Sequence, residues 1–205
     1  MDTLILQALE SVRCPFLTAI FCLFTFWGDE LLLTAVIAVV YYAINKKRGE
    51  TLMMAALSSA GINGAIKDAV RRPRPFQKSV VEAVKVENLL ASTTSIEGSY
   101  SFPSGHTQSS VGIFGSLARW NKQTWLRALC LILCVLVPLS RLYLGVHTPL
   151  DVGVSLIVGT VLVLGLYPLL ERLFAKDRNV LIALGVTVLI SIGFVLYTEL
   201  FPFPA

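Results

Sequence analysis

Residues 125–144 read WLRALCLILCVLVPLSRLYL, and this stretch decides the fold class of the chain. Its only charged residues are Arg127 and Arg141, one close to each end. A helix of about 20 mostly apolar residues is long enough to cross the hydrocarbon core of a bilayer. The stretch therefore predicts a transmembrane helix with a cation near each boundary.

The composition of the whole chain agrees with that prediction. Of its 205 residues, 55% are apolar and only 15% are charged, and the mean hydropathy is +0.73. Such values lie outside the range of soluble domains and are typical of polytopic membrane proteins. We expect an all-α membrane helical bundle with six transmembrane helices, at 31–46, 51–70, 104–120, 125–144, 149–171 and 179–200.

The N-terminal part of the chain predicts helices that lie in the headgroup layer. Residues 2–13 would form an amphipathic helix whose apolar face carries Ile5, Leu9 and Val12. The apolar run in 14–27 is too short to span comfortably and is typical of an interfacial or re-entrant segment, although a seventh span is an alternative.

We expect a single domain over residues 1–205, with interfacial helices in 1–27 and a transmembrane core in 28–205. The one long polar connection, 71–103, is of the length at which loops often act as lids or binding loops. Whether 76–100 is a lid or a solvated connector stays open. The sequence does not indicate an oligomeric state.

The loop charges predict the orientation of the bundle. With six spans, three short basic connectors fall on one side of the membrane, and the positive-inside rule makes that side cytoplasmic. The polar clusters described next then face the outer side. The connectors carry Lys46, Lys47 and Arg48, then Arg119, Lys122 and Arg127, then Arg172, Lys176 and Arg178.

The first polar cluster contains Lys67 and Arg74. Lys67 falls near the outer end of the second predicted span, where a cation is costly unless it has a function or a partner. Lysine offers a compact charge and arginine a planar fork, and both bind phosphate. Headgroup anchoring is an alternative. We expect Arg71 and Arg72 to be such anchors or to pair with Asp68.

The second cluster, Pro103-Ser104-Gly105-His106, stands where a loop enters the third predicted span. A helix N-terminus offers free N–H groups and positive potential to an anion. Ser104 adds a hydroxyl donor, Gly105 permits close approach of the backbone, and His106 can protonate a leaving oxygen. An ordinary helix start, with Ser104 or Ser101 as N-cap, is the alternative.

The third cluster runs from Arg141 to Asp151. Thr148 as N-cap, Pro149 at the first helical position and Asp151 in the first turn predict a helix start. This arrangement puts His147 just outside the helix, within reach of the Asp151 carboxylate. A carboxylate bonded to one imidazole nitrogen leaves the other free to attack. An interfacial histidine beside a capping aspartate is the alternative.

Together these residues resemble a known family. The patterns Lys67-x6-Arg74-Pro75, Pro103-Ser104-Gly105-His106 and Ser140-Arg141-x5-His147-x3-Asp151 look like the complete three-part signature of the type 2 phosphatidic acid phosphatase superfamily. The resemblance covers residues from about 28 to 165. It implies an integral-membrane lipid phosphatase that needs neither a metal nor another cofactor.

The resemblance also implies a role for each residue. His147 would be the nucleophile that forms a phosphohistidine, and Asp151 would orient it. His106 would first protonate the leaving group and then activate water. The remaining signature residues would hold the phosphate and stabilise its charge: Lys67, Arg74, Ser104, Gly105 and Arg141.

The expected function is hydrolysis of a lipid phosphate or diphosphate at the extracytoplasmic face of a bacterial cell membrane. Undecaprenyl diphosphate and phospholipid phosphates are favoured, with sphingoid phosphates as the alternative. The run from Ser140 to Thr148 resembles both bacterial lipid phosphatases and sphingosine-phosphate phosphatases and does not choose between them. The expected partners are the lipid substrate and membrane lipids.

Other functions fit the sequence less well. Vanadium-dependent haloperoxidases bind their anion in a similar site, but they are soluble proteins, whereas this sequence predicts a membrane protein. A lipid transporter or scramblase explains cations within the membrane but not the pairing of His147 with Asp151. The four cysteines lack metal-type spacing. The net charge of +4 comes without a basic-aromatic surface, so we expect no nucleic-acid partner.

Overall fold

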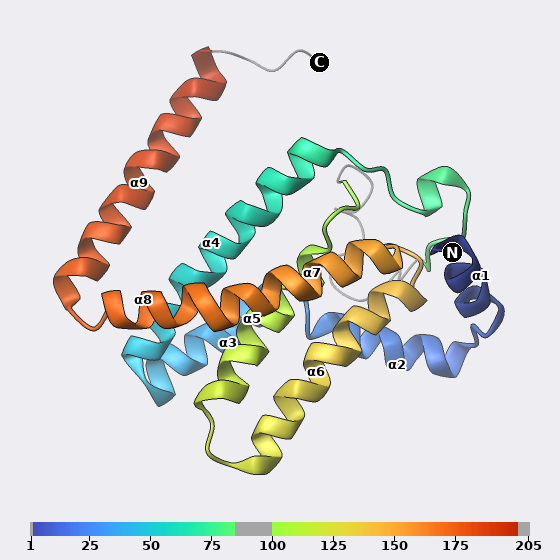
Figure 1. The fold of residues 1–205 in the computed structure, drawn as a ribbon, viewed down its shortest axis with the longest axis horizontal. Helices are drawn as coiled ribbons and strands as arrows, with labels where there is room; N and C mark the ends of the chain where they lie inside the picture. The colour runs from blue at the N-terminus through green and yellow to red at the C-terminus, as the bar shows by residue number, and fades with distance from the viewer. Residues whose placement is uncertain (1, 85–99, 201–205) are drawn as a thin grey trace.

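The computed structural model describes residues 2–84 and 100–200, and all regular secondary structure in these two ranges is helical. This confirms the all-α class (Figure 1). In chain order the helices and helical turns are α1 (Asp2–Ser11), α2 (Pro15–Phe26), α3 (Glu30–Val39), η1 (Val40–Ile44), α4 (Lys46–Val70), η2 (Phe76–Lys78), α5 (Gly105–Trp120), α6 (Thr124–Tyr143), α7 (Pro149–Val161), η4 (Leu162–Leu166), α8 (Tyr167–Leu173) and α9 (Asp177–Leu200).

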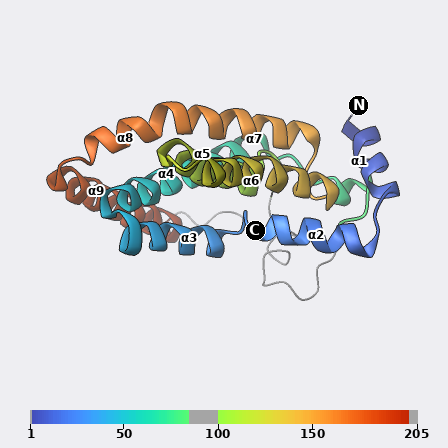
Figure 2. The same cartoon turned by 90° about the horizontal axis from the view of Figure 1, so that it is seen from below.

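The helices stack in layers, with α4, α5 and α6 in the middle (Figure 2). Helices α7 and α8 cover one side of this layer, and α2 and α3 cover the other. The central helix, α5, contacts α3, α4, α6 and α7. Small residues permit this close packing, since a β-carbon at Gly112 would collide with the Tyr167 hydroxyl and one at Gly159 would lie 3.0 Å from Val111.

The predicted number of membrane spans is not confirmed. Within the described residues, Thr124–Tyr143 and Pro149–Leu173 are long and apolar enough to cross a membrane. Helix α2 (Pro15–Phe26) and the continuous helix formed by α3 and η1 (Glu30–Ile44) meet at a bend of 51°. If this bent pair crosses the membrane as one unit, it is a third span.

Helices α4 and α5 are among the predicted spans that are not confirmed. Helix α4 has 25 residues but is diluted by polar and small side chains, including the buried Ser59 and Asn63. Helix α5 has only 16 residues and also carries buried polar groups, such as Gln108. The polar side chains that lower the hydropathy of both helices connect them to each other, as described below.

The basic connectors gather at one end of the bundle, as the sequence predicts. Lys47, at the start of α4, forms an ion pair with Asp177 at the start of α9. Arg119, at the end of α5, donates to the Glu171 carboxylate of α8 at 2.8 Å. The beginning of α4, the end of α5 and the α8–α9 connection therefore lie together (Figure 1).

The N-terminal helices α1 and α2 pack against the end of α6. Tyr143 stacks on Phe21 with ring centroids 4.2 Å apart, and its hydroxyl accepts a hydrogen bond from the Cys14 N–H. Arg13 donates to the carbonyls of Tyr143 and Glu82, at 3.1 and 2.7 Å. These contacts support the turn that follows α6 and leads to His147.

The connection between α4 and α5 is described only in part. Residues 76–84 contain the turn η2 and return to the bundle, where the Val84 N–H donates to the Leu144 carbonyl at 3.1 Å. The remainder of the predicted lid, 85–99, lies outside the described residues.

Candidate active site

The three polar clusters converge around His147, in the turn between α6 and α7. The imidazole is only 2% exposed. Burial lowers the pKa of His147 well below its ordinary value, and the positive charges of Arg74, Arg141 and Lys67 lower it further. His106 is a further neighbour that lowers the pKa of His147. The sequence therefore brings both histidines and all three predicted cations to one site, where His147 is neutral.

The two ring nitrogens of His147 face different groups. Nε2 lies 3.3 Å from a terminal guanidinium nitrogen, Nη1, of Arg74. The same Arg74 nitrogen donates to the Val146 carbonyl at 3.2 Å, which fixes the guanidinium against the turn. Nδ1 lies 3.9 Å from Oδ2 of Asp151. The side of the ring that carries Nε2 therefore faces the cations, and the side that carries Nδ1 faces the carboxylate.

Asp151 is fixed by the helix start that the sequence predicts. Thr148 is the N-cap of α7 and Pro149 its first residue. The Thr148 N–H donates to Asp151 Oδ2 at 2.7 Å, and the Thr148 hydroxyl accepts from the Asp151 N–H at 3.3 Å. This reciprocal capping box holds the carboxylate below the His147 ring.

The structure places Asp151 near His147 but without a direct hydrogen bond. A separation of 3.9 Å exceeds hydrogen-bonding distance. The reason is that Oδ2 already accepts from the Thr148 N–H and, at 2.5 Å, from the Ser101 hydroxyl. Oδ1 accepts from Arg72 at 3.2 Å. The carboxylate therefore lies beside the His147 ring without bonding to it.

Ser101 and Arg72 are site residues that sequence reasoning missed. Of the two roles predicted for Arg72, headgroup anchor or partner of Asp68, the pairing with Asp68 is wrong, because Arg72 binds Asp151 and lies 3.6 Å from Asp2. Arg71 Nε donates to the Asp68 backbone carbonyl instead of its carboxylate. A signal was available, since residues two apart in an extended segment point to the same side, and Arg72 precedes Arg74 by two.

The three predicted cations differ in their surroundings. Arg74 is 3% exposed, and burial lowers its pKa to about 10 although the charge of Asp151 opposes that shift. Arg141 is 1% exposed and donates to the Thr25 hydroxyl at 2.6 Å, while its buried Nε makes no hydrogen bond to a described residue. Lys67 Nζ lies 4.0 Å from the place that a β-carbon at Gly105 would occupy.

Helix α5 begins at the site with Ser104 as its N-cap, which is one of the two residues named in the alternative interpretation of this cluster. The fully buried Ser104 hydroxyl accepts from the Thr107 N–H at 3.4 Å. Because capping uses the hydroxyl as an acceptor, its proton stays available for donation to an anion. Gly105 and His106 follow as the first two residues of the helix. Their backbone N–H groups have no acceptor within the helix.

His106 lies against the connection between α2 and α3. Its buried Nε2 makes no hydrogen bond to any described residue. A β-carbon at Gly28 would lie 3.3 Å from the His106 β-carbon and 2.5 Å from Val137. Gly28, which the sequence did not single out, therefore leaves room for the imidazole. Buried polar groups normally have partners, so the free Nε2 atom is a candidate for contact with a ligand.

A buried polar network joins α4 to α5 next to the cations. Asn63 donates to the Gln108 side-chain oxygen at 3.0 Å, and Gln108 donates to the Ser59 hydroxyl at 2.9 Å. Asn63 lies one turn before Lys67, and Gln108 lies two residues after His106. The network therefore fixes the position of the lysine relative to the histidine. Sequence reasoning did not identify it as part of the site.

The described His, Cys, Asp and Glu side chains form no group of three or more that is suited to a metal ion. The site is instead dominated by cationic and neutral hydrogen-bond donors around two imidazoles. Such an arrangement suits an oxyanion with several charged oxygens, and phosphate is a common biological anion of that kind.

Comparison with known proteins agrees with this chemistry. The model of the PAP2 superfamily matches residues 48–175. The proteins named sphingosine-1-phosphate phosphatase 1 from Mus musculus and Rattus norvegicus are 28% and 27% identical to this chain over 159 and 158 residues. Each alignment covers 74% of this chain and 35% of the relative. The chain therefore spans about a third of the length of these curated relatives.

Solved structures share the fold. A transmembrane PAP2-type phosphatidylglycerolphosphate phosphatase from Bacillus subtilis has a TM-score of 0.65, with 23% identity over 83% of this chain and 84% of its own. LpxE from Aquifex aeolicus has a TM-score of 0.61, with 23% identity over 78% of this chain and 90% of its own. At this identity the likeness establishes the arrangement of helices.

Proposed function

Because this chain belongs to the PAP2 superfamily, we propose that it is a membrane phosphatase that hydrolyses a lipid phosphate or diphosphate through a phosphohistidine. The observation that carries the proposal is the convergence of two imidazoles and three cations on one buried site. His147 is the nucleophile, Asp151 its positioning residue and His106 the general acid and base. Lys67, Arg74, Arg141, Ser104 and the Gly105 N–H bind the phosphate.

In the first step, Nε2 of the neutral His147 forms a bond to phosphorus while the bond from phosphorus to the lipid oxygen breaks. His106, which the bound phosphate anion keeps protonated despite the surrounding cations, donates a proton to that oxygen. The lipid therefore leaves as an alcohol from a phosphomonoester and as a lipid monophosphate from a diphosphate. The negative charge of Asp151 stabilises the positive charge that develops on the His147 ring.

In the second step, His106, now neutral, accepts a proton from water as the water oxygen attacks phosphorus. The bond between phosphorus and Nε2 breaks, which releases phosphate and restores both imidazoles to their starting states. The cations and the N-terminus of α5 hold the non-bridging oxygens throughout. Phosphoryl transfer depends mainly on such positioning and charge stabilisation.

The location of the site supports an extracytoplasmic active site. The basic connectors lie at one end of the bundle, and the positive-inside rule assigns that end to the cytoplasm. His147 lies in the connection between α6 and α7, and the basic α5–α6 connection lies at the other end of α6. We therefore place the site at the outer face, in a bundle of six spans behind interfacial helices α1 and α2.

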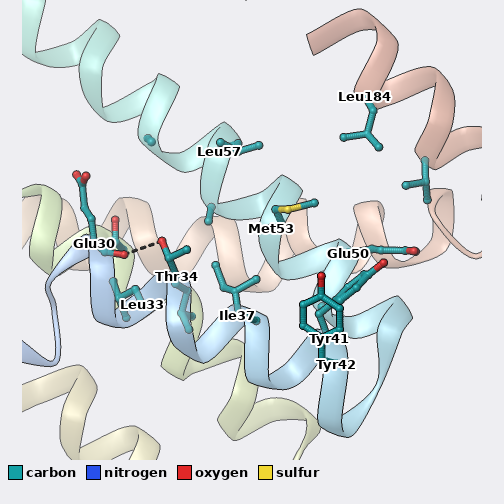
Figure 3. Close-up of a pocket in the computed structure, with 17 residues that line it drawn as sticks. Glu30, Leu33, Thr34, Ile37, Tyr41, Tyr42, Glu50, Met53, Leu57 and Leu184 are labelled. Atoms are coloured by element: carbon teal, nitrogen blue, oxygen red, sulfur yellow. Dashed lines mark hydrogen bonds between the residues drawn. The ribbon is translucent and has the colours of Figure 1, made fainter. Parts of the chain in front are cut away.

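An apolar groove offers a place for the lipid chain. It encloses about 610 Å³ between α3, α4, α5 and α9, and its lining includes Leu33, Ile37, Met53, Leu57, Ala60 and Ile113 (Figure 3). The groove face of α4 leads toward Lys67, which lies two turns beyond Ala60, about 10 Å along the axis. On α5, the groove residue Ser109 lies one turn after His106. A chain in the groove would thus extend from a phosphate at the site.

Replacing Ala60 with tryptophan should block this groove. We expect kcat/KM for a long-chain lipid phosphate to fall about tenfold or more, because loss of burial for a few methylene groups alone has an effect of that size. The kcat/KM for a short, water-soluble phosphate ester should change by no more than about threefold, since such a substrate does not enter the groove.

The matched control is Ala128→Trp on α6, which introduces the same side chain at an exposed position outside the groove. Both variants are assayed in the same detergent micelles with both substrates. Equal losses on the long and short substrates, or an equal effect of the two tryptophans, would exclude the groove as the chain site.

The experiment that tests the proposed function is a phosphate-release panel on detergent-solubilised protein. Polyprenyl diphosphates, glycerolipid phosphates and sphingoid phosphates are compared at equal mole fraction in micelles. We expect release from at least one class, which also identifies the substrate class. Absence of release from all three classes by folded protein would refute the proposal.

A further inference from the structure

We propose that Glu30 makes this site selective for lipid phosphates that carry a primary ammonium group close to the phosphate, as sphingoid phosphates do. The inference rests on the proposed function and names the substrate class of the same site. It is carried by the position of one carboxylate between the cationic cluster and the apolar groove.

Glu30 is the first residue of α3 and lines one end of the groove. Its side chain is exposed and points to the side of α3 on which α4 lies (Figure 3). Glu30 follows Gly28 by two residues, and a β-carbon at Gly28 would lie 3.3 Å from the β-carbon of His106, so the start of α3 lies beside the catalytic site. A negative charge therefore stands at the boundary where the phosphate of a bound lipid would give way to its chain.

The Glu30 carboxylate is available for a ligand, whereas its neighbour is not. The Asp29 side chain caps α3 by accepting from the Leu31 N–H at 2.9 Å. Among the described residues, no group donates a hydrogen bond to the side-chain oxygens of Glu30. A carboxylate beside a phosphate site opposes binding of a purely anionic headgroup but favours one with an adjacent cation. Charge complementarity thus specifies a phosphate with a neighbouring ammonium.

The length of the groove suits a chain that reaches the middle of the membrane. The groove residues of α3 and η1 run from Glu30 to Tyr42, which corresponds to about 18 Å along a helix at 1.5 Å per residue. This length is close to half of the roughly 30 Å hydrocarbon core, the share of one leaflet. At the far end the groove is lined by Tyr41 and Glu50, so its apolar part is closed by polar groups.

The test compares two substrates that differ only at the amine, sphinganine 1-phosphate and its N-acetyl derivative. The measured quantity is the ratio of their kcat/KM values in wild type and in Glu30→Gln. We expect wild type to prefer the free amine, and Glu30→Gln to lower the ratio about fivefold, the upper range for one partly exposed ion pair. Glu30→Lys should lower the ratio further, because it repels the ammonium.

The matched control is Glu50→Gln, which removes a carboxylate at the opposite end of the same groove and should leave the ratio unchanged. A ratio that is the same in wild type and Glu30→Gln, or that falls equally in Glu50→Gln, overturns the inference while phosphate release still supports the proposed function. Failure of folded wild type to release phosphate from any lipid overturns both.

Discussion

Replacing His147 with asparagine should reduce the rate of phosphate release at least about 10⁴-fold, because the variant lacks the atom that attacks phosphorus. Asparagine leaves a polar side chain at this position, and the buried Arg74 guanidinium keeps its hydrogen bond to the Val146 carbonyl. The measurement is the initial rate of inorganic phosphate release from a long-chain lipid phosphate by the detergent-solubilised protein.

The control for this variant is its thermal unfolding. A midpoint within a few degrees of wild type would establish that the loss lies in the chemistry and not in the fold. A folded His147→Asn protein that keeps a tenth or more of the wild-type rate would contradict the assignment of the nucleophile, since no other residue of the site is expected to replace the imidazole.

Replacing His106 with glutamine should slow release from a lipid alcohol by about 10²–10⁴-fold, the range expected for loss of a general acid. The loss should be much smaller for cleavage of a p-nitrophenyl phosphate ester, because that leaving group departs without a proton. The comparison is made in the first turnover, where only the departure of the leaving group is observed.

The difference between the two leaving groups is what identifies the role of His106. If His106 only helped to bind the phosphate, its replacement would slow the cleavage of both substrates by the same factor. Equal losses in the first turnover would therefore contradict general acid catalysis by His106, whatever their size.

Local signals in the sequence predicted local structure well. The run 125–144 became a helix at Thr124–Tyr143, because a long apolar stretch leaves few alternatives. The start of α7 was predicted at residue level, since Thr148, Pro149 and Asp151 each favour a specific capping position. The site residues that belong to such local patterns, His147 and His106 among them, were found for the same reason.

Features that depend on contacts between distant segments were not predicted. Asp151 is surrounded by Ser101 and Arg72, and these hydrogen bonds draw its oxygens away from the His147 ring. Gly28 makes room for His106 only because α2 and α3 meet at the site. These contacts join segments that are far apart in the sequence, so no pattern within one segment predicts them. The predicted count of six spans is not confirmed for a related reason, since polar residues of α4 and α5 face each other and lower the hydropathy of both helices.

The central claim is that Nε2 of His147 carries the phosphoryl group, and the most direct test is to trap and locate it. In His106→Gln, an activated phosphate ester should still form the intermediate while its hydrolysis is slowed for lack of a base. Rapid quenching at alkaline pH, where phosphohistidine is stable, followed by peptide mass spectrometry should place about one phosphoryl group per chain on His147. A phosphoryl group on another residue, or substrate cleavage without any covalent phosphoprotein, would contradict the account.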